Sequence, residues 1–136
     1  MTLVIPNAQE VEVLTNRLTP DHTLKIYGNN VTPGPTSVAG DFTEIAGGGY
    51  ASKPITFANW NITPGTPTVA LYNATQSFVF TGPIGGAGTI YGYFITRNSD
   101  GILLLAERFP AGVVPFSPIN GSFIRVTPRI TCEGGV

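Results

Sequence analysis

The sequence predicts an all-β fold: an antiparallel sandwich or jelly-roll-like barrel of about seven to nine short strands, with one short N-terminal helix. Three observations lead to it. Apolar and polar residues alternate in short segments, which is the period of a half-buried strand. The 17 glycines and 12 prolines separate these segments with turns. Residues 54–96 carry no charged side chain, yet proline, asparagine and threonine interrupt them too often for a membrane span.

A helix is predicted near the start of the chain, between Asn7 and Pro20. Asn7 is the expected N-cap, and Glu10, three residues later, gives a motif close to a capping box. The apolar residues then follow at helical spacing, as Ala8, Val11, Leu14 and Leu18. Pro20 ends the helix, because proline has no backbone N–H and clashes with the preceding turn. The alternation in residues 10–13 also permits a strand, and the sequence leaves that alternative open.

Strands are predicted wherever apolar and polar residues alternate with a period of two. In order, they cover residues 23–27, 42–45, 55–57, 59–62, 68–72, 77–81, 89–96, 102–109 and 122–131. Glycine and proline place loops at residues 28–41, 47–49, 82–88 and 109–118. Residues 55–57 and 59–62 are expected at sheet edges.

The best-defined unit is a hairpin of residues 89–96 and 102–109, joined by a turn that contains Asp100-Gly101. Pairing of Thr96 with Ile102 would place Phe94 opposite Leu104 and Gly92 opposite Ala106. Residues 102–105 are apolar on both faces, which predicts a central strand covered on both sides.

The length of 136 residues predicts one domain: an N-terminal arm and helix (1–20), a β-sandwich (23–131) and a tail (132–136). The N-terminus lacks the regions of a signal peptide, so folding in a reducing cytoplasm is expected. The seven Lys and Arg residues are scattered, which argues against nucleic-acid binding. Cys132 is the only cysteine and His22 the only histidine, so no metal or cofactor is expected.

No pattern predicts catalysis. Asp21-His22 could begin a catalytic triad, but a histidine in a polar loop is ordinarily solvated. Glu107 and Arg108 end an apolar strand and are expected to face solvent or to pair structurally. The glycine-rich loop 82–88 lacks the Gly-Lys-Ser/Thr of a phosphate loop. The aromatic residues are expected mainly in the core, with Phe78 and Phe80 on one strand face and Tyr91 and Tyr93 on one face.

Several segments together are similar to a known group of proteins. They are LKIYGNNVTP (24–33), DFTEI with GY (41–50), TFANWNI (56–62), SFVFTG (77–82), IYGYFITRNSDGILLLAERF (90–109) and RVTPRI (125–130). In this order they resemble small proteins encoded among the virion structural genes of tailed phages. The most specific part is Y-G-Y-F-I-T followed by L-L-x-A-E-R-F. The resemblance spans nearly the whole chain and implies a small virion component without an active site.

The resemblance and the low charge, 11% of residues against about 25% in average proteins, lead to one functional hypothesis. The protein is expected to be a capsid decoration (cement) protein on the outside of the virion. Its expected partners are the major capsid protein and further copies of itself, as a homotrimer or another homo-oligomer, with no membrane partner. The predicted interface residues are Leu3, Val4, Ile5, Val113, Val114 and Phe116. The alternatives are a tail or neck component, such as an adaptor or fibre base, and a carbohydrate-binding sandwich that uses Trp60 and tyrosines.

Overall fold

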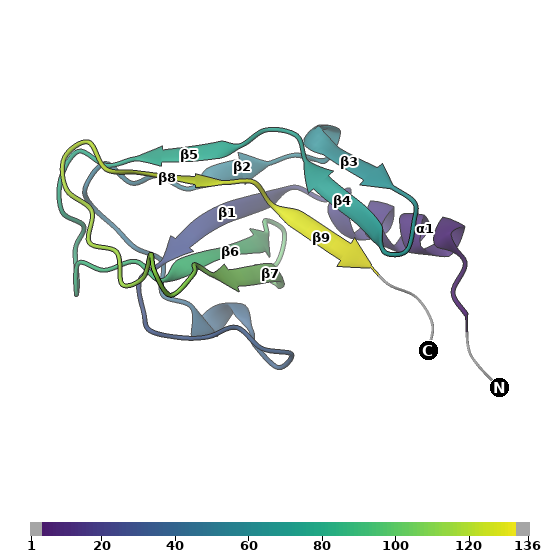
Figure 1. The fold of residues 1–136 in the computed structure, drawn as a ribbon, viewed down its shortest axis with the longest axis horizontal. Coiled ribbons are helices and arrows are strands. Elements are labelled where there is room, and N and C mark those ends of the chain that lie inside the picture. The colour runs from purple at the N-terminus through teal and green to yellow at the C-terminus, as the bar shows by residue number, and fades with distance from the viewer. Residues whose placement is uncertain (1–3, 133–136) are drawn as a thin grey trace. The chain divides into compact units, whose positions relative to one another are not determined.

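The computed structural model describes residues 4–132, which fold into two compact units (Figure 1). The first unit contains residues 4–21, 56–76 and 126–132, and the second contains residues 22–55 and 77–125. Nine strands in antiparallel sheets and one α-helix confirm the all-β prediction for the described residues. The sheets are open and do not close into a barrel, so the sandwich is the architecture that fits. That both units together form the single expected domain stays a prediction.

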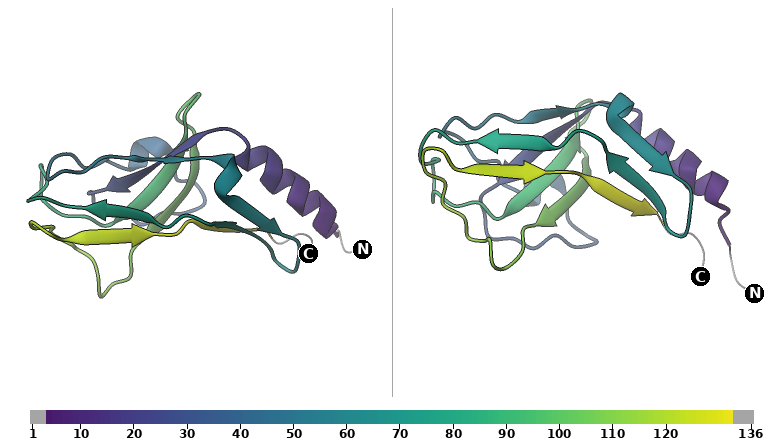
Figure 2. Two further views of the ribbon diagram at one scale, coloured as in Figure 1. Left: turned by 90° about the horizontal axis from the view of Figure 1, so that it is seen from above. Right: turned by 45° about the horizontal axis from the view of Figure 1, so that its top comes forward.

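The first unit combines helix α1 (Asn7–Leu18) with a three-stranded sheet. Its strands are β3 (Trp60–Thr63), β4 (Thr68–Tyr72) and β9 (Arg129–Cys132), in the order β3-β4-β9. A short 3₁₀ helix, η2 (Phe57–Asn59), precedes β3. Helix α1 packs against β3 and β4, and Figure 2 shows it beside them from two further directions. Leu14 and Leu18 are buried as the helical spacing predicted, whereas Ala8 is exposed.

The start of α1 differs from the predicted capping box. Pro6 is the N-cap and Asn7 is the first helical residue, and no side chain caps this end. Glu10 is only 3% exposed, because it lies one turn before Leu14 on the face that packs on the sheet. The Thr68 hydroxyl, itself fully buried, donates a hydrogen bond of 2.6 Å to the Glu10 carboxylate. Glu10 therefore belongs to the core of the first unit.

The second unit contains a four-stranded antiparallel sheet in the order β2-β1-β6-β7. Its strands are β1 (His22–Tyr27), β2 (Lys53–Ile55), β6 (Gly92–Arg97) and β7 (Leu103–Arg108). A 3₁₀ helix, η1 (Ala39–Asp41), lies in the loop after β1. The ribbon of β5 (Gln76–Val79) and β8 (Phe123–Val126) lies almost wholly in this unit. Of the predicted strand 42–45, only an isolated bridge between Glu44 and Tyr27 forms.

The second unit is packed around Tyr27, Phe42 and Phe94. The ring centroids of Tyr27 and Phe42 are 4.9 Å apart, and those of Phe42 and Phe94 are 5.4 Å apart. Gly92 allows this packing, because a Cβ atom there would lie 2.6 Å from the Tyr27 hydroxyl oxygen and would collide with the Glu107 carbonyl oxygen. The absence of a side chain at Gly92 therefore leaves the space that the side chain of Tyr27 occupies.

The predicted hairpin exists, but its register and its place in the sheet were wrong. Phe94 pairs with Ala106 instead of Leu104, and Gly92 pairs with Arg108. An irregularity between Ile95 and Thr96 shifts the register, which alternation alone does not reveal. Strand β7 is an edge strand with mostly half-buried residues, whereas β6 is one of the two inner strands and has five buried residues.

The last predicted strand, 122–131, is two strands in two sheets. Strand β8 pairs with β5, and β9 pairs with β4. Pro128 lies between them and cannot donate a backbone hydrogen bond to a ladder, while its carbonyl accepts one from the Tyr72 N–H at 3.0 Å. Cys132, predicted to begin the tail, is the last residue of β9, and residues 133–136 lie outside the described part of the chain. Within residues 4–132, no helix has the length and apolarity needed to cross a bilayer.

Candidate interaction surfaces

The segment before α1 carries two of the predicted interface residues. Val4 is 68% exposed, Ile5 is also exposed, and neither belongs to a helix or strand. Leu3, the third residue predicted there, lies outside the described residues. This segment belongs to the first unit, whereas the other predicted interface residues belong to the second.

In the proline-rich loop 109–118, one of the three predicted interface residues is exposed. Val113 is 48% exposed, at a turn in which its N–H donates to the Pro110 carbonyl at 2.8 Å. Val114 and Phe116 are half-buried. Phe116 and Ile90 exchange two backbone hydrogen bonds, of 2.7 and 3.1 Å, which anchor the loop. The loop is irregular, as its prolines predicted, and Val113 is its accessible apolar side chain.

The β5–β8 ribbon presents apolar side chains that the sequence analysis did not assign to an interface. Val79 is 59% exposed and Phe123 is 56% exposed, and Ile119 in the preceding turn is also exposed. The guanidinium of Arg125 lies 4.8 Å from the centre of the Phe123 ring. The signal was present, because placing Phe78 and Phe80 on one strand face puts Val79 on the other. Both phenylalanines are indeed buried.

A hollow of about 240 Å³ lies beside the glycine-rich loop, lined partly by Asn29, Thr43 and Glu44. Two of its polar side chains, those of Glu44 and Asn29, already have partners in the protein. The Tyr50 hydroxyl donates to the Glu44 carboxylate at 2.7 Å, and burial is the main cause that raises the pKa of Tyr50. The Asn29 amide bonds two backbone groups at 2.8 Å. The hollow is smaller than the ~300–1,000 Å³ of typical ligand sites.

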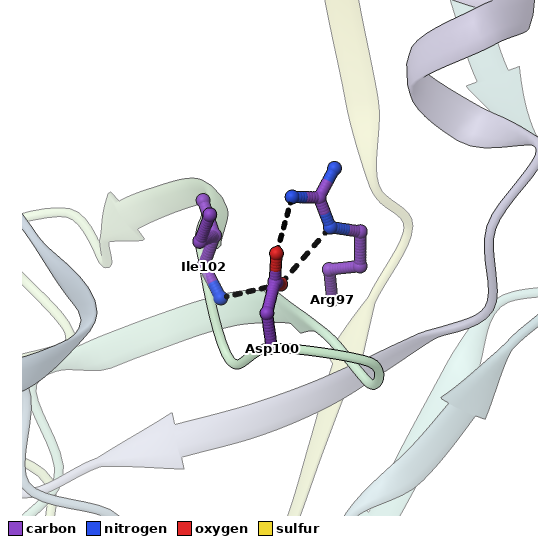
Figure 3. A network of polar contacts seen from close by, with 3 residues as sticks. All are labelled: Arg97, Asp100 and Ile102. Atoms are coloured by element: carbon purple, nitrogen blue, oxygen red, sulfur yellow. Dashed lines mark hydrogen bonds and ion pairs between the residues drawn. The ribbon is translucent and has the colours of Figure 1, made fainter.

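A second hollow, of about 350 Å³, lies between loop 37–40 and the start of β7. Its apolar lining includes Val38 and Ile102, which are both exposed. Asp100, at its edge, accepts hydrogen bonds from the Arg97 guanidinium and from the Ile102 N–H, at 3.2 Å for the latter (Figure 3). These contacts hold the turn of the β6–β7 hairpin in shape. The hollow is therefore an apolar depression beside exposed Val38 and Ile102, and its one charged side chain, Asp100, is already bonded within the turn.

Two residues that the sequence analysis considered for catalysis, His22 and Glu107, lie within the sheet of the second unit. His22 does not lie in a solvated loop: it is the first residue of β1 and is 2% exposed, on the same strand face as Leu24 and Ile26. The Glu107 carboxylate accepts a hydrogen bond of 2.7 Å from the Tyr93 hydroxyl. Burial, followed by the effect of Glu107, raises the pKa of Tyr93 above its ordinary value. In residues 4–132, no group of three or more His, Cys, Asp and Glu side chains is arranged to hold a metal ion.

Trp60 is buried in the first unit and does not present an open ring face. Its ring packs edge-on against Tyr72, with centroids 5.1 Å apart. Tyr93 and Phe80 are also buried. These aromatic residues contribute to the core, as the sequence analysis predicted. Trp60 is therefore not placed to stack on a sugar, as the carbohydrate-binding alternative requires.

Comparison of the chain with protein-family models, with curated proteins and with solved structures found no match.

Proposed function

We propose that this protein is a capsid decoration protein of a tailed phage, which binds the outer shell and stabilises it through contacts with the major capsid protein. Its sequence resembles small virion proteins, and its surface composition suits such a role. The observation that carries the proposal is the number of large apolar side chains exposed on a surface with little charge. They include Val4, Val79, Val113, Ile119 and Phe123.

Exposed apolar side chains of this kind favour permanent contacts. Monomeric proteins rarely expose large contiguous apolar patches, whereas obligate interfaces are more apolar and resemble a core cut in half. Burying the exposed half of a valine side chain contributes about 1 kcal/mol at 25 cal/mol per Å². Several such contacts in each copy would oppose rupture of a shell, because rupture would have to expose all of them again.

The first test is the copy number in purified virions, measured by quantitative mass spectrometry against the major capsid protein. A ratio near one to one supports a shell location. A ratio of a few per cent would assign the protein to the tail or neck, with the ring symmetry expected there. Complete absence from virions would overturn the proposal.

A second test uses shells that lack the protein, to which purified protein is added. Val113→Ser is a cleaner variant than a triple replacement of the loop, because Val114 and Phe116 are half-buried and Phe116 is anchored to Ile90. We expect Val113→Ser to weaken binding about fivefold, from the loss of about 1 kcal/mol. The matched control is Val38→Ser, another exposed valine in a loop. Equal binding of both variants and wild type would remove loop 109–118 from the interface.

A further inference from the structure

The outer face of the β5–β8 ribbon combines exposed apolar side chains with a cation. Ser77 and Val79 of β5 are exposed, as are Phe123 and Arg125 of β8, whereas Phe78 is buried on the inner face. The two strands lie side by side in Figure 1, and among the described residues they pair only with each other. Val79 is 59% exposed and Phe123 is 56% exposed, so this face is uncovered.

Two cations at the ribbon lie over aromatic rings and have no carboxylate partner. The Arg125 guanidinium lies 4.8 Å from the centre of the Phe123 ring, and the Lys53 ammonium lies 5.6 Å from the centre of the Phe78 ring. Within residues 4–132, neither cation forms an ion pair. A guanidinium stacked on a ring is held in place while its N–H groups stay free to donate to both oxygens of a carboxylate.

Lys53 also lines a hollow of about 170 Å³ beside β5, together with Ser77 and Val79. The stacked rings of Tyr50 and Phe78, with centroids 5.9 Å apart, form another part of its lining. The hollow is smaller than the ~300–1,000 Å³ of small-molecule sites, which suits it to one side chain of a protein partner. An ammonium and a hydroxyl in the lining favour a side chain that ends in a carboxylate.

The chain has no carboxylate of its own in these segments. Residues 45–99 and 108–132 contain neither aspartate nor glutamate. These two ranges include Lys53, both strands of the ribbon and the turn before β8. The surface is therefore apolar and positively charged, and the missing charge has to come from another molecule.

We propose that the outer face of the β5–β8 ribbon binds a partner protein through an apolar segment that carries carboxylates. The partner's carboxylates pair with Arg125 and with Lys53 in the hollow, and its apolar side chains cover Val79 and Phe123. Arginine and aromatic residues are enriched among the few residues that contribute most of the binding energy at protein interfaces. Arg125 stacked on Phe123 provides both at one position.

Charge complementarity favours a protein over a lipid surface or a nucleic acid. Basic segments that bind anionic membranes carry about four to eight lysines and arginines. Specific DNA-binding proteins neutralise about six to ten phosphates. The ribbon offers Arg125 and Lys53 beside two exposed apolar side chains, which is the composition of a small protein-binding surface.

This inference does not depend on the proposed function, and it is tested with the purified full chain. The probe is a short fluorescent peptide of alternating glutamate and leucine, and a second peptide carries lysine in place of each glutamate. Fluorescence polarisation should show that wild type binds the glutamate peptide. Arg125→Glu should bind it at least about tenfold more weakly and should prefer the lysine peptide. Arg125→Gln, which removes the charge without reversing it, should give an intermediate affinity.

The matched control is Arg129→Glu, the same charge change at an exposed position of β9 in the first unit. Its affinity for the glutamate peptide should stay within about twofold of wild type, and circular dichroism should show that all variants are folded. Failure of wild type to bind the glutamate peptide, or an equal loss in Arg125→Glu and Arg129→Glu, would overturn the proposal. It would also be overturned if wild type bound phosphatidylserine vesicles or oligothymidine in place of the peptide.

Discussion

Gly92 is the position at which a single added carbon should perturb the second unit most. It lies in the inner strand β6, where an alanine Cβ would lie 2.6 Å from the Tyr27 hydroxyl oxygen and would collide with the Glu107 carbonyl oxygen. Tyr27 is fully buried against Phe42, and the Glu107 carbonyl belongs to the backbone of β7. Neither group can move without disturbing the sheet, so Gly92→Ala should cost about 3 kcal/mol, the upper part of the range for overpacked cores.

This loss of unfolding free energy corresponds to a decrease in the melting temperature, Tm. An unfolding entropy of about 2.1 cal/mol/K per residue gives roughly 290 cal/mol/K for a chain of 136 residues. A loss of about 3 kcal/mol then lowers Tm by about 10 °C. Thermal melting followed by circular dichroism, with calorimetry as a second method, would measure it.

The matched control is Gly112→Ala. Gly112 has no atom within 4 Å of the position that a Cβ would occupy. Alanine there should be neutral or slightly stabilising, because it restricts the unfolded chain. A Gly92→Ala protein that melts within about 2 °C of the Gly112→Ala protein would refute the packing argument at β6.

Three further outcomes are expected. Thr68→Val keeps the shape of the side chain but removes the hydroxyl that bonds the buried Glu10, and urea unfolding should show a loss of about 1–3 kcal/mol. Burial raises the pKa of Tyr93, so above pH about 10 the tyrosine ionises more readily in the unfolded chain than in the folded one, and the folded protein loses stability. The unfolding free energy of Tyr93→Phe should therefore fall less between pH 9 and 11 than that of the wild type. Arg97 lowers the pKa of Asp100, so the Tm difference between wild type and Asp100→Asn should be constant above pH about 4 and shrink below it; a difference that does not change with pH would contradict this.

Local patterns were sufficient for the elements themselves. The spacing of Leu14 and Leu18 predicted α1, and alternation with an Asp100-Gly101 turn predicted the β6–β7 hairpin. These features depend on residues close in sequence, whose side chains meet within one turn or across one hairpin. The exposure of Val4 and Val113 could be expected from the sequence, since both are apolar residues in segments with proline; that they form an interface stays a prediction.

Long-range packing decided the rest. The burial of Glu10 depends on Thr68, which is 58 residues away, and the burial of His22 depends on its place at the start of β1. The apolar sequence of β7 is compatible with a central strand, and only the order of the strands shows that it lies at an edge. The composition and the spacing of apolar residues predicted the β class, helix α1 and the low charge. The sheet order, the register and the place of β7 at an edge came from tertiary structure, because they depend on contacts between residues that the sequence places far apart.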